Sequence, residues 1–117
     1  MLITQVKVDS NLQQGEFVQW DSQALQCVRC TDHSNMMGVV DVPPAQDREG
    51  VWLATIRQAG VATALAGEDI SAQGGALGID ANGRAIISTG HSCGIIQAQP
   101  YGQPARLSVD MVVIWLR

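Results

Sequence analysis

The sequence predicts an all-β fold, a single-domain β-barrel or β-sandwich of short antiparallel strands. Its apolar runs are short and rich in Val and Ile, and Gly, Pro, Asn, Asp and Ser interrupt them about every ten residues. A chain of 117 residues predicts one domain, long enough to bury most of its apolar surface. Only residues 62–69 have weakly helical composition, and Gly60 and Gly67 limit that stretch.

The expected strands follow one another with little between them. "EFVQW" and "ALQCVRC" flank "DSQ", "GVVDV" ends at Pro43-Pro44, and "VWLATI" leads through "RQAG" to "VATAL". In the final run, Met111, Val113 and Trp115 form one apolar face, while Val112 and Ile114 lie on the other. We therefore expect the last strand to be buried on both sides.

The glycine-rich segment "GGALGIDANGRAII", residues 74–87, predicts a β-hairpin. Its glycine spacing does not match the dinucleotide-binding pattern, and no Walker-type phosphate loop occurs in the chain. Asn82-Gly83 between two apolar runs is a strong hairpin signal, because both residues tolerate the positive φ that a tight turn requires.

A second segment resembles this hairpin. "GEFVQWDSQALQCV" aligns with it, so that Gly15 matches Gly74 and Asp21 matches Asp80, and "MGVV" answers the later "CGII". We interpret residues 1–14 as an N-terminal arm or edge strand and residues 15–117 as one β-domain. An internal duplication would give repeats 15–60 and 74–117, although two hairpins of similar length could also match by chance.

Charge and composition restrict the function classes. The formal net charge is −4 and the seven Lys and Arg are scattered, which argues against a nucleic-acid-binding face. No apolar run is long enough to span a bilayer, and the N-terminus lacks the pattern of a signal peptide. We expect a chain made in a reducing cytoplasm, with no membrane, nucleic-acid or cofactor partner.

Cysteine and histidine residues suggest one alternative function. Cys27, Cys30, His91 and Cys93 include the donor types that bind zinc. However, residues three apart on a strand point to opposite faces, and "VR" between the first two cysteines does not favour a tight knuckle. Inert, buried cysteines are the competing interpretation. We expect no metal, and no enzyme, because no nucleophile elbow is present.

Three tryptophans allow a second alternative, a carbohydrate-binding module. Exposed aromatic faces bind sugars, and Trp20 could serve in this way. Trp52 and Trp115 lie in strongly apolar strands, where packing in the core or between subunits is expected instead.

Most of the chain, from about Gly15, resembles the small head decoration (capsid cement) proteins of tailed bacteriophages. The resemblance rests on the hairpin from Ile70 to Arg84, the strand from Gly94 and the final apolar strand that ends in Arg117. "GEFVQWDSQALQCV…MGVVDV" resembles the opening unit of that family. Cys93 and the three tryptophans depart from its pattern.

The resemblance implies a structural virion protein on the capsid surface. Such proteins bind the outside of the expanded head, often as homotrimers, and bridge neighbouring copies of the major capsid protein. A head-fibre or tail-fibre β-module is the related alternative. We expect contacts from the N-terminal arm and from two loops, residues 41–50 and 97–105, whose prolines reduce the entropic cost of ordering. The candidate contact residues are Leu2, Ile3, Val6, Pro43, Pro44, Arg48, Pro100, Tyr101 and Pro104.

Overall fold

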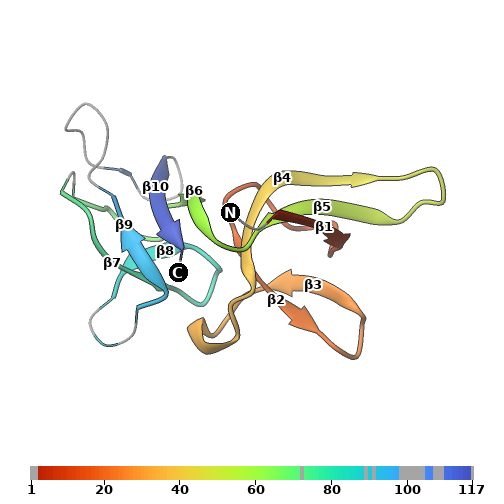
Figure 1. Ribbon diagram of the computed structural model, residues 1–117, viewed down its shortest axis with the longest axis horizontal. Coiled ribbons are helices and arrows are strands. Elements are labelled where there is room, and N and C mark those ends of the chain that lie inside the picture. Colours follow the sequence, from red (N-terminus) through yellow and green to blue (C-terminus); the bar gives the residue numbers. More distant parts are fainter. Residues whose placement is uncertain are drawn as a thin grey trace.

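The protein folds into two five-stranded antiparallel sheets (Figure 1). The computed structural model describes residues 3–71, 73–88, 90, 92–97, 105–106 and 110–116. Within these ranges a 3-10 turn, His33–Asn35, is the sole helical element, so the all-β prediction is confirmed. The first sheet contains β1 (Ile3–Lys7), β2 (Phe17–Asp21), β3 (Gln26–Arg29), β4 (Gly38–Gln46) and β5 (Trp52–Arg57). The second contains β6 (Gly60–Leu65), β7 (Gly75–Ile79), β8 (Ala85–Ile87), β9 (Gly94–Ile96) and β10 (Met111–Leu116).

The two sheets have the same strand order. The first runs β1-β5-β4-β2-β3 and the second β6-β10-β9-β7-β8, so each strand of one sheet has a counterpart in the other. In both, the residue after the first strand forms a parallel bridge with the third strand, Val8 with Cys27 and Ala66 with Ala85. Each sheet therefore curls until its edge strands approach, and β1 occupies in the first sheet the position of β6 in the second.

The strand registers also correspond. Val18 pairs with Gly38 in the first sheet, as Leu77 pairs with Gly94 in the second. A Cβ on Gly38 would approach the Arg57 carbonyl oxygen to 2.5 Å, and a Cβ on Gly94 would overlap the Trp115 carbonyl oxygen. Both sheets therefore require a glycine at the same position, where the backbone of the paired strand comes closest. An internal duplication stays a prediction. The corresponding units of the structure begin at β1 and β6, before the expected repeat starts at Gly15 and Gly74.

The hairpin turns show both agreement and a correction. The Asp21 carboxylate accepts a hydrogen bond from the Gln23 amide (2.9 Å), and the Asp80 carboxylate accepts one from the Asn82 amide (2.8 Å). The turns span residues 22–25 and 81–83, so the ungapped alignment of the two hairpins is wrong by one residue after the aspartate. In the 81–83 turn Gly83 alone takes a positive φ (+72°), since this turn has a three-residue loop rather than the expected Asn-Gly turn. In the 22–25 turn Leu25 takes a positive φ (+54°).

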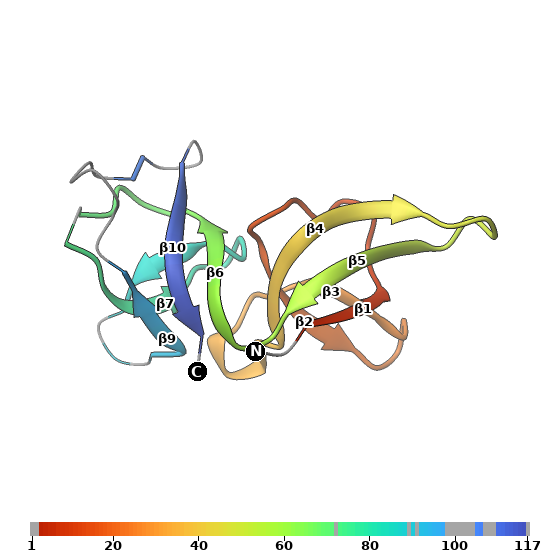
Figure 2. The same ribbon diagram turned by 45° about the horizontal axis from the view of Figure 1, so that its top comes forward.

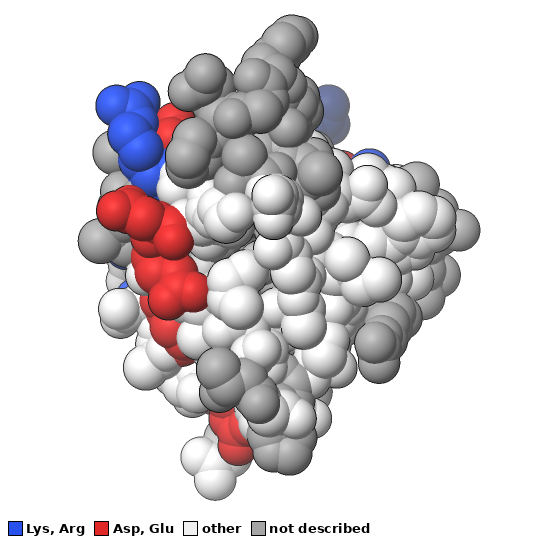
Figure 3. All heavy atoms as spheres, turned by 90° about the vertical axis from the view of Figure 1, so that its left-hand side faces the viewer, with Lys and Arg blue, Asp and Glu red and all other residues white. Residues whose placement is uncertain are grey.

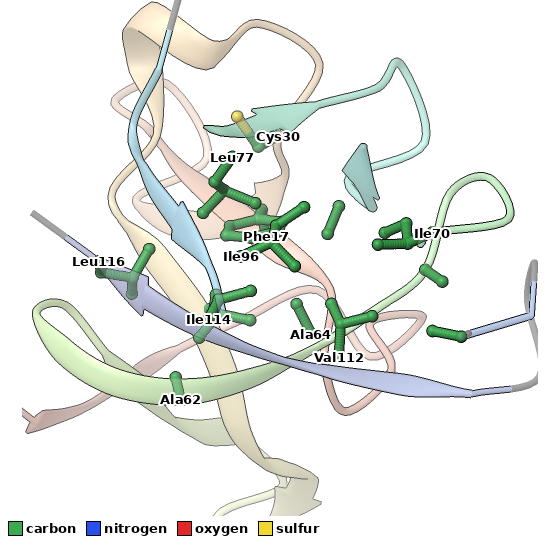
Figure 4. Packing of buried hydrophobic residues seen from close by; sticks show 14 residues of the cluster. Phe17, Cys30, Ala62, Ala64, Ile70, Leu77, Ile96, Val112, Ile114 and Leu116 are labelled. Atoms are coloured by element: carbon green, nitrogen blue, oxygen red, sulfur yellow. The ribbon is translucent and has the colours of Figure 1, made fainter. Parts of the chain in front are cut away.

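Two apolar cores hold the sheets. The core of the first sheet includes Val18, Val40 and Ile56. The core of the second sheet is larger because Phe17, Cys30 and Val39 of the first sheet join it. Phe17 lies among the side chains that the second sheet turns inward, next to Leu77 and Ile96 (Figure 4). The two sheets are therefore packed into one unit.

The strand expected at "VATAL" is confirmed as β6, although residues 62–69 have a weakly helical composition, because β10 pairs with the whole length of β6. Two other detailed expectations are wrong. The strand expected to end at Pro43-Pro44 continues to Gln46, and register shifts on both sides of Val42 accommodate the prolines. The last strand buries only one face: Val112, Ile114 and Leu116 are buried, while Met111 and Trp115 are exposed.

Candidate interaction surfaces

The hairpin of β4 and β5 extends well beyond the body of the first sheet (Figure 2). Its turn is organised by the Asp47 carboxylate, which accepts hydrogen bonds from the Glu49 amide (2.8 Å) and the Val51 amide (3.0 Å). Pro43 and Arg48 are exposed and Pro44 is half-buried. The structure thus places these three predicted contact residues on one projecting hairpin with a defined turn.

The N-terminal segment forms an edge strand. β1 pairs with β5 of its own sheet, with Ile3 opposite Arg57 and Lys7 opposite Leu53. Ile3 is exposed, and Val6 is half-buried against the first core. Leu2 lies outside the described residues. β1 is therefore an exposed sheet edge available to a neighbour.

The second predicted contact loop lies mostly outside the described residues, and this includes Pro100, Tyr101 and Pro104. At its end, Ala105 is buried and forms an antiparallel bridge with Ile70. The backbone hydrogen bonds between these two residues, each 2.9 Å, attach that end of the loop to the second core.

The cysteines are separated by the sheet. Cys27 belongs to the first core and Cys30 to the second, so their side chains point to opposite faces. Burial raises the pKa of both thiols, which opposes the thiolate that zinc requires. Cys93 is half-buried with its Sγ 3.6 Å from the Leu77 carbonyl oxygen, and His91 lies outside the described residues. Within the described part of the chain, no three His, Cys, Asp or Glu side chains are grouped so that they could hold a metal ion.

The outer face of the second sheet carries an apolar row that the sequence analysis did not predict. Val61, Trp115 and Ile95 are cross-strand neighbours on β6, β10 and β9, and they are 44%, 52% and 52% exposed. Ala76 continues the row on β7 and is also exposed. We call these four residues the apolar row. The error came from treating an uncharged strand face as buried, although large apolar side chains on a strand can equally face a partner.

The surroundings of the apolar row are partly polar. An open hollow of about 410 Å³ lies beside it, lined by Val61 and Val113 on one side and by Asp41 and Arg57 on the other. Arg57 and Asp41 form an ion pair of 3.1 Å. Figure 3 views the end of the molecule that the second sheet forms, where described acidic side chains lie along one side and much of the rest is uncharged.

All three tryptophan side chains are exposed. Trp20 and Trp52 lie on the first sheet and Trp115 on the second. The expectation of core packing for Trp52 and Trp115 is therefore wrong. The alternative of packing between subunits, which the sequence left open, is untested by a single chain.

Within the described residues, the protein is an all-β protein that presents hairpins and sheet faces to solvent. No helix in this part of the chain is long and apolar enough to cross a membrane. No protein-family model and no curated protein matches the sequence. The structure is similar to that of the head fiber gp8.5 N base in bacteriophage phi29, with a TM-score of 0.63 and 11% sequence identity. The similarity covers 99% of this chain and 93% of the other, so the two share their whole fold.

Proposed function

We propose that this chain is a structural protein of a tailed-bacteriophage head, a decoration or cement protein that binds the outer capsid surface. The observation that supports this proposal best is the similarity in fold to the phi29 head fiber base over nearly the full length of both chains. The local resemblance of residues 15–117 to capsid cement proteins points in the same direction. In this proposal the role is structural rather than enzymatic, and no cofactor takes part.

The proposed mechanism is multivalent attachment. The β4–β5 hairpin presents Pro43, Pro44 and Arg48 away from the body, where they can reach the major capsid protein. Prolines limit the backbone entropy lost on binding, and an exposed arginine can pair with a capsid carboxylate. Several copies held in a homotrimer bind with an avidity that no single hairpin reaches. Bridging adjacent capsid subunits in this way stabilises the expanded shell of the virion.

A pelleting assay tests the proposal. Purified protein is mixed with expanded, undecorated shells of the phage that encodes it, and bound copies are counted against the shell lattice. We expect saturation at a stoichiometry that fits the icosahedral lattice and a higher melting temperature for the shell. A folded protein that stays in the supernatant at every concentration contradicts the proposal.

Variants test the role of the hairpin. Arg48→Glu reverses the charge at the exposed hairpin turn, and we expect shell affinity to fall about tenfold because each lost contact is multiplied by multivalency. The control variant is Gln23→Glu, which adds a negative charge to the exposed β2–β3 turn, outside the predicted contact segments. If only the control variant loses binding, the contact lies on that turn and the hairpin assignment is wrong.

The similarity to a head fiber base also favours a second candidate, a base module that anchors a fibre to the head. The two candidates differ in what lies outward of this domain on the virion. Cryo-electron microscopy of purified virions separates them: density that ends at the domain indicates a cement protein, and an extended stalk indicates a fibre base. Carbohydrate binding is less well supported, because Trp115 lies on a different sheet from Trp20 and Trp52.

A further inference from the structure

Half of the apolar row has a buried counterpart on the first sheet. The other half does not, since Trp115 corresponds to the half-buried Arg57 and Val61 to Ile3, which is 47% exposed. The pair Phe17–Val39 in the first sheet corresponds to the pair Ala76–Ile95 in the second. Phe17 and Val39 are 0% exposed because the second sheet packs over them, whereas Ile95 is 52% exposed. The same position is therefore an interface in one sheet and bare in the other.

The covering surface within the chain can also be identified. β6 is the edge strand of the second sheet, and its inward residues Ala62 and Ala64 belong to the same core as Phe17 and Val39. The Leu65 amide donates a hydrogen bond to the Gly15 carbonyl oxygen (2.9 Å), which fixes β6 against the first sheet. The first sheet thus packs against the second sheet along the β6 edge.

The corresponding edge of the first sheet is β1, and it is less covered. Thr4 pairs with Ile56 as Ala62 pairs with Ile114, so Thr4 is the counterpart of Ala62 and Val6 that of Ala64. Ala62 and Ala64 are buried, while Thr4 and Val6 are only half-buried. Each chain therefore has an exposed outer face on one sheet and a partly exposed edge on the other.

We propose that the apolar row of one chain packs against the β1 edge of a second copy of the same chain, which repeats between chains the contact between its two sheets. This inference names the self-contact of the proposed head protein and rests on that proposed function only for its biological setting. The occupant follows from the fold, because within the described residues the β6 edge packs over Phe17 and Val39, and β1 is the matching edge of the first sheet. The row itself carries no charged side chain, which suits burial against Thr4 and Val6.

The geometry makes this contact heterologous, since different surfaces of the two chains meet. Heterologous contacts close into rings or continue as open filaments. A closed ring of a few copies would present several β4–β5 hairpins to one capsid surface, as the proposed attachment requires. The trimer that the resemblance to capsid cement proteins implies is one such ring.

The first test changes the centre of the apolar row. We expect the native chain to form a discrete oligomer in analytical ultracentrifugation, and Trp115→Asp to raise its dissociation constant by roughly 30-fold or more, because a buried aromatic anchor is lost. The matched control is Leu25→Asn, which removes a 62% exposed apolar side chain from the β2–β3 turn. An unchanged circular dichroism spectrum shows that each variant is folded. A native chain that stays monomeric, or equal effects of both variants, overturns the inference.

The second test distinguishes a heterologous contact from a two-fold one. Thr4→Arg should block the β1 edge and leave the apolar row intact, so it should also be monomeric. An equimolar mixture of Thr4→Arg and Trp115→Asp chains keeps one intact row and one intact edge, and we expect it to form a one-to-one heterodimer. A mixture that stays monomeric overturns the pairing. Shell pelleting separates the two proposals. A Trp115→Asp chain that oligomerises like the native chain and still binds shells overturns the self-contact alone, whereas a native oligomer that does not bind shells overturns the proposed function alone.

Discussion

At the scale of single residues, a buried carboxylate is the most demanding polar feature. The Glu16 side chain is 1% exposed, and its Oε2 lies 2.8 Å from Arg29 Nε. Its Oε1 accepts a hydrogen bond from the Gln13 amide (2.7 Å). A buried charge is tolerated only when such partners replace water. The segment before β2 is thereby tied to β3, beside the point where Phe17 enters the second core.

Arg29→Met should destabilise the protein by about 2 kcal/mol, because it removes the charged partner of Glu16 while leaving the carboxylate buried. Urea unfolding followed by circular dichroism measures the loss. Glu16→Gln in the Arg29→Met background is the control, and it should recover part of the stability by removing the unpaired charge. No recovery would show that Arg29 acts through its apolar stem instead.

The buried thiols give a pH prediction. Burial raises the pKa of Cys27 and Cys30, so the folded state favours the neutral thiol. In the unfolded chain a thiol ionises near its ordinary pKa of about 8.5. Their stabilising effect is complete below that value and declines as pH rises through and above it. Melting temperatures should fall between about pH 8 and 10, and Cys27→Ala/Cys30→Ala, although less stable at pH 7, should show a shallower decline. Equal slopes would contradict this cause.

At the scale of elements, close approach of the paired strands β4 and β5, and of β9 and β10, restricts one position in each pair to glycine. Gly38 and Gly94 occupy these positions, where the neighbouring backbone leaves no space for a Cβ. The exposed β4–β5 hairpin is long because Pro43 and Pro44 lie between register shifts instead of ending the strand. At these positions the neighbouring backbone, more than the burial of side chains, determines which residues the strands accept.

Gly94→Ala should lower the free energy of unfolding by about 2 kcal/mol or more, because the added methyl group overlaps the Trp115 carbonyl and forces the strands apart. Gly90→Ala is the matched control, since a Cβ there meets no atom within 4 Å, and it should change stability by less than about 0.5 kcal/mol. Denaturant midpoints compare the two. Equal costs would mean that the β9–β10 pair relaxes freely.

Sequence patterns located the hairpins because their signals are local. The backbone preferences of Asp80 and Gly83 indicate a turn, and the alternation in "RLSVDMVVIWLR" indicates a strand. The place of residues 62–65 after "RQAG" predicts a strand, although their alanines favour helix, and pairing with β10 stabilises the strand. The apolar row escaped detection because whether Trp115 faces a core, a partner or water depends on what lies opposite its sheet. The cysteines' opposite directions, by contrast, followed from strand geometry.

At the scale of the whole molecule, the two sheets depend on each other through Phe17. This side chain leaves the first sheet and fills the second core, and the Phe17 amide donates a hydrogen bond to the Gly83 carbonyl oxygen (2.7 Å). The Cys30 amide in turn donates to the Phe17 carbonyl oxygen (2.9 Å). A core shared in this way makes unfolding of either sheet costly for the other.

Phe17→Ala should therefore destabilise the protein by about 3–5 kcal/mol and weaken hydrogen-exchange protection in both sheets. Trp20→Ala on the same strand is the matched control, because it removes an exposed aromatic ring and should have a much smaller effect. Exchange followed by mass spectrometry resolves the two sheets. Loss of protection confined to the first sheet would show that they unfold independently.

The shared core also has a consequence for the order in which the chain is made. All five strands of the first sheet are complete at Arg57, before any strand of the second sheet has been synthesised. Until β6 to β10 have been synthesised, Phe17 and Val39 are not covered by the second sheet, and the growing chain exposes an apolar surface that is prone to aggregation. Ribosome speed and chaperone access during that interval, rather than the stability of the finished protein, would then govern the yield of correctly folded molecules.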